Sequence, residues 1–127
     1  MTKPLIMVID DCAITLDVTR IHLEEAGYEV ITRSKPIGTT AEIIRMKPDC
    51  VLIDISMPGL TGDKITKVIR EKNVETKIVL FSAKEESELL ELVLECGANG
   101  FIMKTENKAK FINKVKAFIP PWNKALL

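Results

Sequence analysis

The sequence has no excess of charge, no long apolar run and no paired cysteine motif. Basic and acidic residues each number 18, so bulk charge favours binding neither to nucleic acid nor to a membrane surface. The longest strand-like apolar run has five residues, against roughly 20 for a bilayer span, and acids follow it at once, which argues against a signal peptide. The three cysteines form no C-x-x-C pair, which favours free thiols in a protein of the reducing cytoplasm.

Length and composition are those of an ordinary globular domain. With 127 residues, 46% of them apolar and 28% charged, the chain suits one domain and leaves little room for a second. We therefore expect a single domain over residues 1–127. Residues 120–127, which begin Pro120-Pro121-Trp122, are expected to form a tail or the start of a linker.

Strand-like and helix-like segments alternate along the whole sequence. Five such units in this order predict an α/β doubly wound fold, a parallel sheet with helices on both faces, because right-handed crossovers leave few alternatives. The second strand has only two apolar residues, Val30 and Ile31, and is predicted at an edge. The predicted strands are Leu5–Ile9, Glu29–Arg33, Cys50–Ile53, 77–81 and Gly100–Met103. The predicted helices are 12–26, 39–46, 62–72, 85–96 (with Leu89, Leu90, Val93 and Leu94 burying one face) and a last helix marked by apolar residues within 111–119.

Reactive side chains directly follow four of these strands. Asp10 and Asp11 follow the first, Asp54 the third, Ser82 the fourth and Lys104 the fifth. Ligands of open α/β sheets bind beyond the carboxyl ends of the strands, so these groups share one pocket if the first and third strands are neighbours. Three carboxylates so close repel one another, and a hard divalent cation such as Mg²⁺ relieves that repulsion.

This set of groups is suited to accept a phosphoryl group. Asp54 would be the nucleophile and would form an acyl phosphate. The metal and the Lys104 ammonium would neutralise charge on the phosphoryl oxygens, and Ser82 would donate a hydrogen bond to the product. Each residue alone has a more ordinary interpretation: an acid after a strand is commonly a helix cap or a solvated loop residue.

The residues resemble the receiver domain of two-component response regulators, from Leu5 to about Ile119. The resemblance is carried by several short motifs in the family's order and spacing. They are Asp10-Asp11, Asp54 with Met57-Pro58 and Gly62, Ser82-Ala83, and Gly97-Ala98-Asn99-Gly100-Phe101 leading to Lys104.

The resemblance implies a fold, a cofactor and roles for these residues. The fold is the flavodoxin-like five-stranded parallel sheet of order 2-1-3-4-5, and the cofactor is Mg²⁺. Asp54 would be the phosphoacceptor and Asp11 the main metal ligand, with Asp10 acting through water and the Ser56 backbone carbonyl completing the shell. Ser82 and Phe101 would be the switch pair. The partner would be a sensor histidine kinase or phosphotransfer protein.

Two positions depart from the family pattern. Thr105 follows Lys104, where the family usually has proline, and Phe101 stands where tyrosine is common. Thr105 is the feature that favours an alternative function, a phosphorylation-independent interaction module. A second alternative, an Asp-nucleophile phosphohydrolase, normally needs an acid two residues after the nucleophile, and here that residue is Ser56.

The output surface is expected on the face formed by the helix 85–96, the strand Gly100–Met103 and the last helix. The first of these helices carries an acidic stripe, Glu88, Glu91 and Glu95, and the last helix is rich in lysine, a pairing that would suit a symmetric homodimer. Ordinary solvated faces that suit the helix dipoles explain the same charges. An output partner is expected to bind this face.

Overall fold

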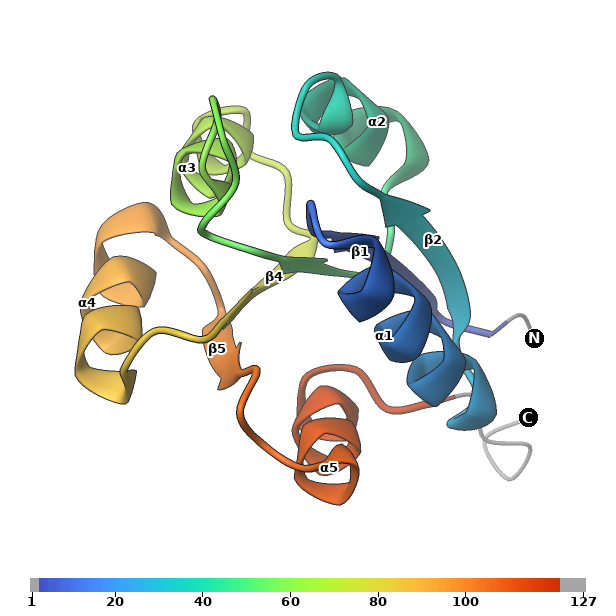
Figure 1. The fold of residues 1–127 in the computed structure, drawn as a ribbon. Helices are drawn as coiled ribbons and strands as arrows, with labels where there is room; N and C mark the ends of the chain where they lie inside the picture. The colour runs from blue at the N-terminus through green and yellow to red at the C-terminus, as the bar shows by residue number, and fades with distance from the viewer. Residues whose placement is uncertain (1–2, 122–127) are drawn as a thin grey trace.

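A computed structural model describes residues 3–121, and within them five parallel strands form one sheet in the order β2-β1-β3-β4-β5 (Figure 1). This confirms the predicted fold class and the strand order implied by the resemblance. The strand β2 lies at an edge, as its few apolar residues predict. The strands are β1 Leu5–Ile9, β2 Glu29–Arg33, β3 Cys50–Ile53, β4 Lys77–Ser82 and β5 Gly100–Met103.

Helices cover both faces of the sheet. Because successive strand residues point to opposite faces, the apolar strands divide into two clusters. One packs Val8, Leu52 and Phe81 against α1 and α5, and the other packs Ile53 and Leu80 against α2, α3 and α4. Figure 1 shows α1 and α5 together on one side. The helices are α1 Ala13–Glu25, α2 Thr39–Met46, α3 Gly62–Glu71, α4 Glu86–Cys96 and α5 Lys108–Phe118.

The register of the central strands places the reactive residues at one edge of the sheet. Ile9 of β1 lies beside Ile53 of β3, so the next residues, Asp10 and Asp54, leave the sheet side by side. The Asp54 amide donates to the Ile9 carbonyl at 2.9 Å, which continues the pairing to the site itself. On the other side of β3, β4 and β5 bring their own carboxyl ends to the same edge.

Helix α4 differs from the prediction in the face that it buries. Leu89 is fully buried and Val93 packs on the core, but Leu90 and Leu94 are 52% and 78% exposed. The prediction that all four apolar side chains bury one face is therefore wrong for two of them. The sheet covers only one side of α4, so Cys96 completes the buried stripe with Leu89, and the other two leucines face away.

The end of α5 is joined by a hydrogen bond to Tyr28, the residue that precedes β2. The Tyr28 hydroxyl donates to the Ile119 carbonyl at 2.5 Å, and burial raises the pKa of Tyr28 to about 12, so the phenol stays a donor. Trp122 and the rest of the predicted tail, 122–127, lie outside the described residues. No helix within residues 3–121 has the length and apolar character that a membrane crossing needs.

Candidate functional site

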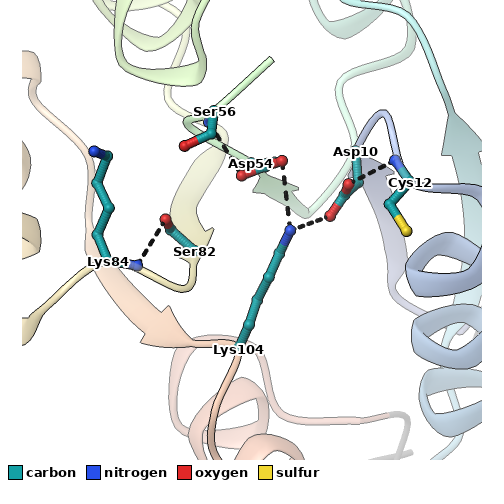
Figure 2. A network of polar contacts seen from close by, with 7 residues as sticks. All are labelled: Asp10, Cys12, Asp54, Ser56, Ser82, Lys84 and Lys104. Atoms are coloured by element: carbon teal, nitrogen blue, oxygen red, sulfur yellow. Dashed lines mark hydrogen bonds and ion pairs between the residues drawn. The ribbon is translucent and has the colours of Figure 1, made fainter.

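Three strands deliver charged side chains to one point at the carboxyl edge of the sheet. Asp10 and Asp11 follow β1, Asp54 follows β3 and Lys104 follows β5. Figure 2 shows Asp10, Asp54 and Lys104 pointing toward one another. Ligand oxygens of the three aspartates lie within 4.8 Å of one another, and the Lys104 ammonium reaches Asp10 and Asp54. The structure therefore brings together four of the five groups that were predicted at the strand ends, the fifth being Ser82.

Asp10 is the most enclosed of the acids. Its side chain has no exposed surface, and its Oδ1 accepts the Cys12 backbone N–H at 2.9 Å, which orients the carboxylate at the start of α1. Its Oδ2 lies 2.6 Å from the Lys104 ammonium but accepts no aligned hydrogen bond from any of the described residues. One buried oxygen thus has a charge partner and retains capacity for a further ligand.

Asp54 lies in the same enclosed space, with 5% of its surface exposed. Burial raises the pKa of Asp54, and the charge of Asp10 acts in the same direction. The Ser56 backbone N–H, which donates to Oδ1 at 3.1 Å, and the Lys104 ammonium, 3.4 Å from Oδ2, favour the carboxylate and oppose this rise. Asp54 is therefore an enclosed carboxylate whose charge is only partly compensated by its neighbours.

Lys104 is the counter-ion of the site. Burial acts to lower the pKa of Lys104, but the carboxylates of Asp10 and Asp54 together outweigh it and raise the pKa. The ammonium also lies 5.6 Å above the centre of the Phe81 ring. Thr105 does not remove Lys104 from the site, because the next turn is closed by the Glu106 N–H donating to the Met103 carbonyl at 3.1 Å.

The oxygen groups at this point fit a hard divalent cation. Asp10, Asp11 and Asp54 supply carboxylate oxygens within 4.8 Å of one another, and Asp11 is exposed, so water can complete the shell. Among the described residues no backbone N–H donates to the Ser56 carbonyl, which leaves this oxygen available as well. The donor set is all oxygen, as Mg²⁺ prefers.

The two expected switch residues lie beside the site without contacting Asp54. Ser82 is buried, and its hydroxyl oxygen accepts the Lys84 backbone N–H at 3.2 Å, so it is bound within its own loop (Figure 2). Phe101 is partly buried on β5, where it packs on the cluster that contains Leu89 of α4. Both residues therefore connect the edge of the site to α4.

Sequence reasoning gave Gly62 no role beyond that of a motif residue, and the structure supplies one. A Cβ atom at Gly62 would lie 2.3 Å from the Asp54 carbonyl oxygen, closer than any real contact, so only glycine lets α3 begin against the Asp54 backbone. The hydrogen bond from the Cys12 N–H to Asp10 Oδ1 was also not anticipated. A backbone amide has no side-chain signature, so no pattern in the sequence indicates it.

Comparison with known proteins agrees with this geometry. The response regulator receiver domain profile matches residues 6–116. The chain is 30% identical over 114 residues to the alkaline phosphatase synthesis transcriptional regulatory protein PhoP of Bacillus subtilis, covering 90% of this chain and 48% of that protein. It is 32% identical over 117 residues to the CAI-1 autoinducer sensor kinase/phosphatase CqsS of Vibrio cholerae, covering 90% of this chain and 17% of that protein.

A solved structure, the chemotaxis response regulator CheY4 of Vibrio cholerae, superposes with a TM-score of 0.83 at 22% identity, covering 91% of this chain and 98% of that one. At this identity the likeness shows the fold. The chain spans about half or less of the curated relatives that it matches. Because the profile matches most of its length, the chain belongs to the response regulator receiver domain family.

Proposed function

We propose that this receiver domain is the phosphoacceptor switch of a two-component phosphorelay, with Asp54 as the residue that is phosphorylated. The observation that carries the proposal is the enclosed Asp54 carboxylate, faced by the Lys104 ammonium and two further carboxylates. The phosphodonor would be a sensor histidine kinase, a phosphotransfer protein or a small acyl phosphate. CqsS, which this chain resembles, is itself named a sensor kinase/phosphatase. The expected location in the cytoplasm stays a prediction.

The proposed reaction is the transfer of one phosphoryl group. An Asp54 carboxylate oxygen forms a bond to phosphorus while the bond from phosphorus to the donor nitrogen or oxygen breaks, and the donor keeps the electron pair. Lys104, already 3.4 Å from Asp54, would pair with the phosphoryl oxygens. Asp10, Asp11 and the Ser56 carbonyl would hold Mg²⁺, which supplies positive charge to the transferring group when bound. No enzymatic activity beyond this self-phosphorylation and the matching self-dephosphorylation is proposed.

The switch would begin at Ser82. Its hydroxyl now accepts from Lys84, and it would turn to donate to the phosphoryl group on Asp54. Phe101, packed on the same cluster as Leu89 of α4, would follow into the space that is freed. The surface that changes would then be the α4-β5-α5 face, where Leu90 and Leu94 are exposed and available to an output partner.

A homodimer across this face is the finer part of the proposal. Its charge argument is weaker than the sequence suggested, because Glu88, Glu91 and Glu95 line a groove that α4 shares with Asp63 and Lys64 of α3. The acidic stripe thus lies on the flank of α4 toward α3. Light scattering of the beryllofluoride-treated protein at low and high salt tests the dimer. Charge-paired association should weaken with salt, and a monomer in both conditions removes the dimer.

The phosphoacceptor is tested by intact-mass spectrometry after incubation with acetyl phosphate and Mg²⁺. We expect one added phosphoryl group, absent in Asp54→Asn and absent with EDTA. A modification that survives in Asp54→Asn would overturn the assignment. Lack of any modification would favour the alternative of a phosphorylation-independent interaction module.

A further inference from the structure

Arg70, in the last turn of α3, makes an unusual set of contacts at the edge of the sheet opposite to the site. Its guanidinium donates three hydrogen bonds: to the Gly97 carbonyl at 2.8 Å, to the Val74 carbonyl at 2.8 Å and to Asn99 Oδ1 at 2.7 Å. Within residues 3–121 no carboxylate lies at ion-pair distance from it. Two of these bonds therefore join the end of α3 to the segment that follows α4, and the bond to Val74 holds the segment that follows α3.

This segment is fixed on both of its sides. Gly97 is the C-cap of α4 with φ +84°, a conformation that favours glycine, and a Cβ atom there would lie 3.0 Å from Arg70 Cγ, so the arginine side chain packs tightly on this residue. The Asn99 side chain also accepts the Ile78 N–H at 2.8 Å, and the Asn99 N–H donates to the Ile78 carbonyl at 2.8 Å. The carboxyl end of α4 is thus tied to α3 and to the start of β4.

The amino end of α4 has far fewer attachments. Its N-cap residue, Glu85, makes no side-chain capping hydrogen bond, and every residue from 83 to 88 is exposed. The preceding loop is held by the Lys84 N–H donating to Ser82 Oγ at 3.2 Å. The first buried side chain is Leu89, and the other buried residue of the helix is Cys96, at the fixed end.

From this asymmetry we infer that Arg70 anchors the carboxyl end of α4, so that the helix swings about Gly97 when Ser82 releases the Lys84 amide. The inference rests on the proposed phosphoacceptor function and assigns a positioning role to a residue far from the chemistry. A helix fixed at one end turns a small displacement of its other end into a change of orientation. Leu90 and Leu94, which lie between the two ends, would carry that change to the surface.

The test is amide hydrogen exchange with and without beryllofluoride and Mg²⁺, in the wild type and in Arg70→Gln. In the wild type we expect exchange to change by about tenfold or more over residues 84–89 and by less than about twofold over 94–99. In Arg70→Gln the response should spread into 94–99. Arg45→Gln is the matched control, because Arg45 is an exposed arginine in the last turn of α2. In a parallel incubation with acetyl phosphate and Mg²⁺, intact mass should show that all three proteins still gain one phosphoryl group.

A merely structural role would predict a different result. Loss of local stability alone would raise exchange over 94–99 in the ligand-free variant but leave the response to beryllofluoride confined to 84–89, and that result overturns the anchor. Arg70→Lys, which keeps the charge but cannot reach three acceptors at once, carries the test if Arg70→Gln does not fold. If the wild type is phosphorylated by acetyl phosphate, yet its hydrogen exchange changes equally at both ends of α4 when beryllofluoride is added, the anchor alone is refuted. A wild type that is not modified refutes the proposed function as well.

Discussion

Replacing Asp54 by asparagine should stabilise the metal-free protein, although it removes the proposed phosphoacceptor. Asparagine keeps the shape of the side chain, and its Oδ1 can still accept the Ser56 N–H. What it removes is a negative charge that is 5% exposed and lies within 4.8 Å of two other carboxylates. The free energy of unfolding should therefore rise, because the folded state no longer holds that charge in an enclosed and acidic space.

The size of the effect follows from opposing charge interactions. At an effective dielectric constant of about 20, the 4.8 Å limit gives a repulsion of about 3.5 kcal/mol between Asp54 and Asp10, and the 3.4 Å contact with Lys104 gives an attraction of about 5 kcal/mol. Exposed Asp11 is screened and adds about 1 kcal/mol of repulsion. These interactions nearly cancel, so the cost of burying the carboxylate decides the sign. We expect a gain of about 1–2 kcal/mol from Asp54→Asn, once relaxation and water entry reduce that cost.

The gain should depend on pH in a definite direction. Burial raises the pKa of Asp54 in the folded state above its ordinary value. Between those two values the folded state binds more protons than the unfolded state, so the stability of the wild type falls as pH rises through the folded pKa. Below pH of about 4 the carboxyl is protonated in both states. The advantage of the asparagine variant should therefore be small at pH 4 and reach its full size at neutral pH.

Urea denaturation followed by circular dichroism in EDTA, from pH 4 to pH 8, measures this difference directly. Asp17→Asn is the matched control, because the Asp17 side chain is 72% exposed on α1. Adding Mg²⁺ should stabilise the wild type and reduce or reverse the advantage of Asp54→Asn. The electrostatic reasoning is refuted if Asp54→Asn is less stable than the wild type at neutral pH, or if its stability advantage is as large at pH 4 as at neutral pH.

Three further changes probe the same site. Asp11→Asn should abolish most of the rise in melting temperature that millimolar Mg²⁺ gives the wild type, and an undiminished rise would exclude Asp11 as a ligand. Lys104→Met should lower the free energy of unfolding of the metal-free protein by about 2–3 kcal/mol. This is less than the usual cost of breaking a buried ion pair, because the Lys104 side chain is 21% exposed. Mg²⁺ should restore part of the lost stability. Gly62→Ala should cost about 2 kcal/mol or more and slow phosphorylation, since its Cβ must displace the Asp54 carbonyl; a stable, fully active variant would contradict that packing.

Most of the fold was predictable because strand and helix have different periods. Continuous apolar runs such as Cys50–Ile53 predicted buried strands, and the observed ends of the ten elements lie within a few residues of the predicted ones. The proximity of Asp10 and Asp54 followed from their positions after β1 and β3 once those strands were taken as neighbours. That neighbour relation came from the family resemblance, since local patterns do not determine strand order.

Side-chain partners within the site were less accessible to sequence reasoning. Lys104 was expected to neutralise charge on the phosphoryl oxygens, and the sequence did not indicate that its ammonium lies closer to Asp10, at 2.6 Å, than to Asp54, at 3.4 Å. Ser82 was expected to donate a hydrogen bond to phosphorylated Asp54, which stays a prediction; in the structure its hydroxyl accepts the Lys84 backbone N–H. Both outcomes depend on distances of about an ångström between elements far apart in the chain. A residue type and its spacing do not contain that information.

The arrangement also explains how a charge added at Asp54 could reach α4. Three carboxylates and one ammonium leave the site two negative charges in excess, which one divalent cation balances. A phosphoryl group on Asp54 adds further negative charge and competes with Asp10 for Lys104. The Lys104 backbone N–H donates to the Ser82 carbonyl at 2.8 Å, so the two residues that would turn toward the phosphoryl group are joined through the backbone. Because the Ser82 hydroxyl in turn holds the Lys84 amide, a change in charge balance at Asp54 acts on the loosely held first turn of α4.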